Sequence, residues 1–197
     1  MIRALIFDCD GTLTDSMYAH FSAWREALLV QGISLDEPSF YRHSGTPSSR
    51  VIPMLAAEQG KTVDFEAALI AKEEAFLRSL DALQPMVNVV QIAKENRGRK
   101  KMAVASGGTR RLVRHQLQQV EILEWFDTIV TCEDTERHKP DPHVFWEAAD
   151  RLGVKPEHCL VYEDGEPGIE AARRAGMECV DVRTMTSIPR SKGMSRG

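Results

Sequence analysis

Residues 4–12 read ALIFDCDGT: a short apolar run passes directly into two aspartates, a glycine and a threonine. Four more short apolar runs, typical of strands, follow at residues 102–105, 128–132, 159–162 and 179–182. Several are nearly continuous rather than alternating, as expected for strands that helices cover on both faces. Helical patterns separate the later runs, so crossover connections join parallel strands. The sequence therefore predicts an α/β fold with a doubly wound, Rossmann-like parallel sheet.

The first two runs are separated by about 94 residues, far more than one crossover helix needs. This insert has helical patterns of its own. Residues 51–55 indicate a helix with Pro53 in its first turn, and residues 64–83 indicate a longer one. Another apolar stripe, which ends near Gly32, has helical spacing and consists of Met17, Phe21, Trp24 and Leu28.

These patterns divide the chain into units. We predict a catalytic core over residues 1–14 and 85–186, a helical cap over residues 15–84, and a loose tail over residues 187–197. In the core, Asp141 ahead of Pro142 predicts a helix N-cap. A further helix, over residues 166–175, is expected to stop at Gly176.

The overall composition excludes several classes of protein. The net charge of −4 argues against a nucleic-acid binder, because phosphate backbones demand a basic face. No apolar stretch is long enough to span a membrane or to serve as a secretory signal. The cysteines form no C-x-x-C pair and are expected to be reduced thiols: Cys9, Cys132, Cys159 and Cys179. We expect a cytoplasmic monomer with no nucleic-acid or membrane partner.

Two acidic clusters are expected at one edge of the sheet. Asp8 and Asp10 directly follow the first run, and Glu163 and Asp164 directly follow the fourth. Ligands of open parallel sheets bind beyond the carboxyl ends of the strands, at the topological switch point. If the first and fourth strands are neighbours, the carboxylates converge and need a hard divalent cation, with Mg²⁺ favoured. The simpler interpretation is a turn with solvated aspartates.

Two further strand ends carry groups that suit a phosphate. Ser106 and Gly107 stand between the second run and a helical pattern, where they offer a hydroxyl and backbone N–H groups to an anion. Lys139 follows the third run, and its ammonium can offset the repulsion between an aspartate and a phosphate. Taken singly, Ser106 is more often a helix cap and Lys139 a surface charge. Four strands that end in such groups, in a fixed order, favour a phosphate site.

The same residues resemble a known family. They match, over essentially the whole chain, the four motifs of the haloacid dehalogenase-like superfamily: Asp8-x-Asp10-Gly11-Thr12, Ser106, Lys139-Pro140 and Glu163-Asp164. Within it the chain is similar to β-phosphoglucomutase and, more closely, to bacterial fructose-1-phosphate and 6-phosphogluconate phosphatases. The closer resemblance lies in residues 45–50, 138–142 and 180–183.

The resemblance implies a Mg²⁺-dependent phosphatase whose substrate is a small phosphorylated sugar or sugar acid. Asp8 would attack phosphorus and form an aspartyl-phosphate. Asp10 would protonate the leaving oxygen and then deprotonate the hydrolytic water. Ser106, Gly107 and Lys139 would bind the phosphoryl oxygens. The implied metal ligands are Asp8, Asp10 through its backbone carbonyl, Asp164 and Glu163, the last either directly or through a water.

Substrate choice is expected to lie in the cap, which closes over the core. Arg50 is the best candidate for a substrate contact, since a guanidinium suits phosphate, carboxylate or sugar hydroxyls. His20 could touch the sugar, whereas Trp24, four residues on, continues the apolar stripe and is assigned to the cap core. Four other histidines have no ligand spacing and are interpreted as structural: His43, His115, His143 and His158.

Two differences between this sequence and the patterns of related proteins bear on the activity. Gly165 stands where serine is common in the family, which removes a hydroxyl near the metal but no direct ligand, so activity is expected to survive. Residues 106–108 lack the lysine-bearing stretch of the mutase, which favours hydrolysis. The alternatives are a sugar phosphomutase, a phosphoacceptor signalling domain, and a true dehalogenase. The 70-residue cap speaks against the signalling domain, and Asp10 with the metal cluster speaks against the dehalogenase.

Overall fold

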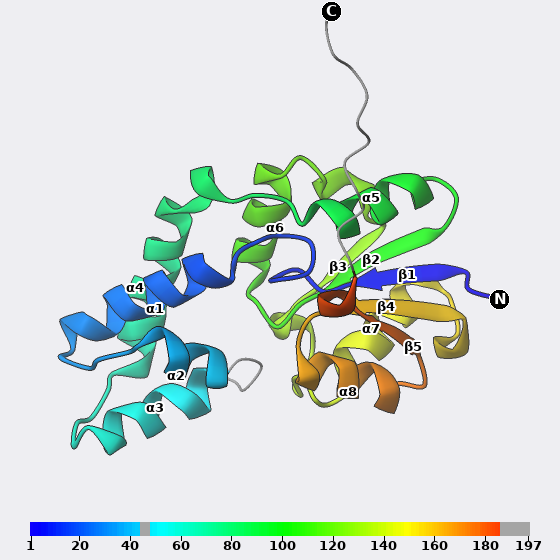
Figure 1. Cartoon of the computed structure of the whole chain (residues 1–197). Helices are drawn as coiled ribbons and strands as arrows, with labels where there is room; N and C mark the ends of the chain where they lie inside the picture. Colours follow the sequence, from blue (N-terminus) through cyan, green and yellow to red (C-terminus); the bar gives the residue numbers. More distant parts are fainter. Residues whose placement is uncertain (44–47, 186–197) are drawn as a thin grey trace, which may run out of the picture.

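The computed structural model describes residues 1–43 and 48–185, and its core is a parallel sheet (Figure 1). The strand order is β3-β2-β1-β4-β5. The strands are β1 (Ala4–Phe7), β2 (Lys101–Ala105), β3 (Thr128–Val130), β4 (Cys159–Glu163) and β5 (Glu178–Asp181). The predicted α/β fold with a doubly wound parallel sheet is confirmed. The switch point lies at β1, which pairs with β2 on one side and β4 on the other.

Two predicted strands extend past the observed carboxyl ends. β3 ends at Val130, and Cys132 already belongs to a short 3₁₀ turn. The side chains of Thr131 and Asp134 form a reciprocal capping box that starts this turn and stops the strand. Likewise, Val182 begins a 3₁₀ turn after β5.

Helices cover both faces of the sheet, which explains its continuous apolar strands. On one face α5 (Val87–Asn96) and α6 (Arg110–Gln119) pack against Leu5, Phe7 and Val104. On the other, α7 (His143–Leu152) and α8 (Glu166–Arg174) pack against Ile6, Ala103 and Val161. Figure 1 shows α5 and α6 above the sheet and α8 below it. Alternate residues of one strand therefore enter two separate cores.

The ends of two core helices test the capping predictions. Asp141 is not the N-cap of α7, because that position is Pro142. The Asp141 carboxylate pairs instead with the His143 ring. α8 ends at Arg174, one residue before the predicted end, and Gly176 adopts the left-handed conformation (φ +74°) that ends a helix.

The insert between β1 and β2 is helical, as predicted, with different boundaries. It contains α1 (Met17–Val30), α2 (Glu37–Arg42), α3 (Ser48–Glu58) and α4 (Phe65–Arg78). The predicted helix over residues 64–83 is too long: Asp64 is the N-cap, and the chain leaves α4 at Ser79 before a 3₁₀ turn at Leu80–Ala82. Pro53 lies inside α3 rather than in its first turn. The sequence patterns also missed α2 and α5.

The insert has its own apolar core and two crossing points to the sheet domain. Phe21, Trp24 and Leu28 of α1 pack with Ile52 and Leu55 of α3, so Trp24 belongs to the cap core as expected. Where the chain leaves and re-enters the sheet domain, the Asp15 N–H donates to the Gln84 carbonyl (2.9 Å). We keep residues 15–84 as the proposed cap. The predicted tail, residues 187–197, lies outside the described residues.

None of the described helices is both long enough and apolar enough to cross a bilayer. The four cysteines are free thiols, as expected.

Candidate active site

The two acidic clusters meet at the carboxyl edge of the sheet. β1 and β4 are neighbours, with Phe7 opposite Tyr162, so the residues that follow these strands are brought together. One carboxylate oxygen from each of Asp8, Glu163 and Asp164 lies within 4.8 Å of the others. Asp8 and Glu163 are buried, at 6% and 3% exposure. The spatial convergence inferred from strand order is present in the fold.

Lys139 lies at the centre of this acidic cluster. Its Nζ donates to Asp8 Oδ1 (2.6 Å), to Glu163 Oε1 (2.7 Å) and to the carbonyl oxygen of Ala105 (3.0 Å). Burial opposes the charged ammonium, but the two carboxylates outweigh it and hold the pKa of Lys139 above its ordinary value. Lys139 is therefore protonated and joins β2 to the ends of β1 and β4.

Asp8 has an unusual electrostatic environment. Burial raises the pKa of the Asp8 carboxyl well above its ordinary value, and repulsion from Glu163, Asp164 and Asp10 adds to this, against the lowering by Lys139. Burial and Glu163 also raise the pKa of Asp164 to about 6. One ammonium thus faces three carboxylates in a dry setting. This excess of negative charge is what a bound cation would relieve.

Glycines permit the loops to approach each other closely. Gly11 has φ +80°, and a Cβ there would overlap the Asp164 carboxylate. A Cβ on Gly168 would overlap the Glu163 carboxylate in the same way. Thr12 adds a hydrogen bond from its hydroxyl to Asp164 Oδ1 (3.2 Å). The glycines of both loops thus leave the space that the Asp164 and Glu163 carboxylates occupy.

The chemistry of the donor set fits a hard divalent cation. Asp8 and Asp164 offer carboxylate oxygens of the kind that Mg²⁺ binds. Glu163 is less free, because its Oε1 accepts from Lys139 and its Oε2 accepts from the Gly165 N–H (2.7 Å). The geometry therefore favours Asp8 and Asp164 as direct ligands, with Glu163 holding Lys139 in place.

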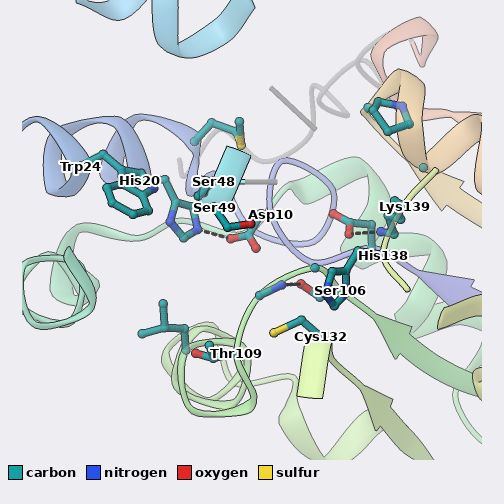
Figure 2. A pocket seen from close by; sticks show the side chains of 18 of the residues that line it. Asp10, His20, Trp24, Ser48, Ser49, Ser106, Thr109, Cys132, His138 and Lys139 are labelled. Atoms are coloured by element: carbon teal, nitrogen blue, oxygen red, sulfur yellow. Dashed lines mark hydrogen bonds and ion pairs between the residues drawn. The ribbon is translucent and has the colours of Figure 1, made fainter. Parts of the chain in front are cut away.

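Asp10 points toward the cap rather than into the acidic cluster. Its Oδ1 accepts from the Ser16 hydroxyl (2.7 Å) and lies 2.6 Å from His20 Nε2 (Figure 2). Burial works against ionisation of Asp10, yet His20 and Ser16 outweigh it and lower its pKa. Burial lowers the pKa of His20, with Lys72 adding to this against Asp10. A neutral imidazole that donates through Nε2 to a carboxylate satisfies both groups.

The segment after β2 forms a polar loop beside Asp10. Ser106 is buried, and its Oγ accepts from the Gly108 N–H (3.0 Å). Thr109 is the N-cap of α6, but its hydroxyl donates to Glu73 of α4 (2.9 Å) instead of capping the helix. Gly107 lines the cavity with them. The loop thus presents a hydroxyl and backbone groups beneath the cap.

A cavity of about 490 Å³ lies between cap and core. Its core side contains Asp8, Asp10, Ser106, Gly107, Lys139, Glu163 and Asp164, and its cap side includes His20, Trp24, Ser48, Ser49, Lys72 and Glu73. Figure 2 shows His20 and Trp24 on one side and Lys139 on the other. Cavities of this size are typical of small-molecule sites. Apart from Arg50, the site residues predicted from the sequence line one space.

The predicted cap contacts are only partly found around this cavity. Arg50 in α3 is exposed and is not among the lining residues, so its substrate contact stays a prediction. Residues 45–47, which carry part of the family resemblance, lie outside the described residues. The histidines interpreted as structural are absent from the lining: His43, His115, His143 and His158.

The sequence analysis missed Lys72. This lysine of α4 is only 7% exposed, lines the cavity, and has its Nζ 5.7 Å from the Trp24 ring centre and 5.5 Å from that of Phe76. Burial lowers its pKa. Among the described residues it has no ion pair. Its signal was present in the sequence, because Lys72 interrupts the apolar stripe of Phe65, Leu69 and Phe76 at a core-facing position.

These groups suit the transfer of a phosphoryl-type anion. Asp8 is a carboxylate next to the Lys139 ammonium, and Asp10 is a second carboxylate beside the polar loop after β2. Lys139 and Ser106 are placed to bind anionic oxygens. A carboxylate nucleophile together with a separate acid–base carboxylate can divide a displacement into two steps.

Comparisons with known proteins agree with this geometry. The family model described as haloacid dehalogenase-like hydrolase matches residues 2–176. The chain is 37% identical over 183 residues to fructose-1-phosphate phosphatase YqaB of Escherichia coli, covering 92% of this chain and 96% of that protein. It is 30% identical to the 6-phosphogluconate phosphatase of the same organism, covering 90% and 80%. Among solved structures, a β-phosphoglucomutase of Clostridium difficile superposes with a TM-score of 0.77 at 26% identity, covering 91% and 83%.

Proposed function

The chain belongs to the haloacid dehalogenase-like hydrolase family, and from that membership we propose that it is a Mg²⁺-dependent phosphatase of small sugar phosphates. The predicted family and reaction class, hydrolysis of a phosphoric monoester, are confirmed by the match and by relatives that are named phosphatases. Fructose 1-phosphate and 6-phosphogluconate, which two relatives are named for, are the proposed substrate types. The observation that carries the proposal is the single cavity shared by Asp8, Asp10, Ser106, Lys139 and Asp164.

In the proposed first step Asp8 is the nucleophile. A carboxylate oxygen of Asp8 bonds to phosphorus as the bond from phosphorus to the sugar oxygen breaks, which yields an aspartyl-phosphate and the free alcohol. Lys139, 2.6 Å from Asp8, offsets the repulsion between this carboxylate and the incoming phosphate dianion. The Ser106 hydroxyl, which directly follows the neighbouring strand β2, would bind a phosphoryl oxygen.

Asp10 is the proposed acid and base. It gives a proton to the departing sugar oxygen and later takes one from the water that attacks the aspartyl-phosphate, which releases inorganic phosphate and restores Asp8. The substrate's negative charge raises the proton affinity of Asp10 when it binds, against the lowering by His20 and Ser16. The contacts of His20 and Ser16 with Oδ1 hold the carboxyl for both transfers.

A metal ion is part of the proposal. Asp8, Asp164 and the backbone carbonyl of Asp10 would hold Mg²⁺, and Glu163 would support it through Lys139. When bound, the ion supplies charge neutralisation for the transferring phosphoryl group.

The cap side of the cavity supports a polar, anionic substrate. Lys72 is a buried cation on the cap side, where it would meet hydroxyl or carboxylate groups of the sugar. Burial of an ammonium is costly unless it is paired, so a ligand group there gains affinity. Trp24 contributes a flat apolar wall to the same side.

Phosphate release from a panel of phosphorylated metabolites tests the proposed function. Purified protein with Mg²⁺ should release inorganic phosphate from fructose 1-phosphate or 6-phosphogluconate, and the Asp8→Asn variant purified identically should release none. The variant controls for contaminating phosphatases. No release from any sugar phosphate would refute the substrate class.

The sugar phosphomutase is the rival, because a β-phosphoglucomutase shares the fold. Incubation with β-glucose 1-phosphate, followed by phosphorus NMR, separates the two activities. Inorganic phosphate identifies a phosphatase, whereas glucose 6-phosphate identifies a mutase.

A further inference from the structure

A buried glutamine lies behind the proposed acid–base residue. Gln116 of α6 is completely buried, between Val113 and Leu117 of the apolar core, and it is not among the residues that line the cavity. A buried side-chain amide costs free energy unless its polar atoms have partners. A leucine would fit the amphipathic pattern of α6 at this position, so the amide calls for an explanation.

The orientation of the Gln116 amide follows from its one strong contact. The hydroxyl of Thr14, which is also completely buried, donates to Gln116 Oε1 (2.7 Å). Within the described part of the chain, no acceptor lies within hydrogen-bond distance of Nε2. The Gln116 side chain is nonetheless near enough to Asp10 to contribute to the lowering of that carboxyl's pKa, after the larger effects of burial, His20 and Ser16.

The loop after β1 brings Asp10 beside Thr14, the residue that holds the Gln116 amide. Thr14 pairs with Asp10 in a short bridge, and the Gly11 N–H donates to the Thr14 carbonyl (2.8 Å), so the two side chains belong to one tight loop. Ser16 and His20 occupy Oδ1. Oδ2 faces the polar loop after β2, since a Cβ on Gly108 would lie 3.6 Å from it.

We propose that Gln116 is a positioning residue for Asp10, with its Nε2 donating to the carboxyl when substrate is bound. This inference rests on the proposed function, in which Asp10 transfers protons. Catalytic hydrogen bonds are often long before the substrate binds and shorten in the complex. Thr14 holds the acceptor end of the amide, so the donor end is presented to Asp10. The carboxyl is thereby held from the buried side, and Oδ2 stays directed at the leaving oxygen.

The test uses two monoesters that differ in their need for an acid. β-Glycerol phosphate has a poor alkoxide leaving group that must be protonated, whereas p-nitrophenyl phosphate has a leaving group that departs without a proton. The value of kcat/KM covers only the steps through release of the alcohol. It therefore isolates the acid role of Asp10 from its later role as a base.

The Gln116→Met variant keeps the length of the side chain and removes both polar atoms. We expect kcat/KM for β-glycerol phosphate to fall about 10- to 100-fold, part of what a positioned acid supplies. The value for p-nitrophenyl phosphate should change less than about twofold. Thr14→Val, which leaves the amide but removes the donor that orients it, should give a smaller loss on the same ester. Gln118→Met, at an exposed position of α6, should leave kcat/KM unchanged for both esters.

The outcomes separate the inference from the function on which it rests. Equal losses on both esters in Gln116→Met would show a structural role only, and unchanged kinetics would show no role; either result overturns the inference. Far-UV circular dichroism and thermal melts of each variant check folding. If Gln116→Met does not fold, Thr14→Val decides the question by the same comparison: its loss of kcat/KM on β-glycerol phosphate against its loss on p-nitrophenyl phosphate. A wild-type protein that cleaves β-glycerol phosphate but no sugar phosphate refutes only the proposed substrate. One that cleaves no alkyl ester refutes both.

Discussion

Replacement of Lys139 by methionine tests the electrostatic account of the site most directly. Lys139 Nζ is 2.6 Å from Asp8 and 2.7 Å from Glu163, and all three side chains are at most 12% exposed. With an effective dielectric constant of about 20, one such contact corresponds to about 6 kcal/mol of attraction, much of it offset by the cost of burying the charges. Removal of one partner from a buried pair costs about 3–5 kcal/mol, because the remaining charge is left uncompensated.

The expected result is a lower melting temperature that depends on pH in a defined direction. A loss of about 3–5 kcal/mol corresponds to roughly 6–20 °C in a chain of this size. Without Lys139, the pKa of Asp8, already raised by burial, loses the one contribution that lowers it. A carboxyl with a raised pKa contributes stability at low pH and loses it as the pH rises. The deficit of the variant should therefore be largest near neutral pH and smaller near pH 5.

Differential scanning calorimetry of both proteins in EDTA, across this pH range, measures the effect without interference from a bound cation. Lys155→Met, at an exposed position, is the matched control and should melt like the wild type. A Lys139→Met protein as stable as the wild type at neutral pH would falsify the account of Lys139 as the charge that holds the cluster together. If the melting temperature of Lys139→Met fell further below that of the wild type as the pH was lowered, this account would be contradicted as well.

The remaining predictions concern activity. Asp8→Asn should abolish phosphate release and, since it removes a carboxylate whose pKa burial has raised, should increase the melting temperature in EDTA; turnover that persists would exclude the covalent mechanism. EDTA should stop phosphate release and added Mg²⁺ should restore it, whereas a rate indifferent to both would remove the metal from the proposal. Lys72→Met should raise KM for the sugar phosphate about tenfold and leave p-nitrophenyl phosphate nearly unchanged, because the nitrophenyl group offers no hydroxyl or carboxylate to the Lys72 ammonium. Arg50→Ala is expected to damage sugar-phosphate turnover more than that of the small ester; equal losses would remove this exposed residue from specificity.

The sheet and the strand-end residues could be predicted because their signals are local. Asp8, Ser106 and Asp164 each follow a strand directly, so an apolar run also marks the place of the reactive group beside it. The parallel topology then brings those ends to one edge of the sheet. The prediction of a shared acidic site depended on one long-range condition, that the first and fourth strands are neighbours. The pairing of β1 with β4 meets that condition.

The local predictions failed where tertiary contacts or competing partners decided the outcome. Asp141 has the residue type of an N-cap, but its carboxylate is engaged by His143, two residues along. The apolar period of α4 continues past Arg78, yet the helix ends at Ser79, whose hydroxyl donates to the Phe76 carbonyl (2.7 Å). Periodicity indicates which face of a helix is buried and carries little information about where it ends.

From its sequence alone the chain determines a parallel α/β core, a helical insert after the first strand, and the order of the groups at four strand ends. Tertiary structure alone determined which groups meet: Lys139 with two carboxylates, Lys72 with the cavity, and Gln116 with Thr14. Asp8 and Lys139 are 131 positions apart, and Thr14 and Gln116 are 102 apart. Contacts at such separations depend on how strands and helices pack, whereas the residue pattern within each element reports only the face that it buries.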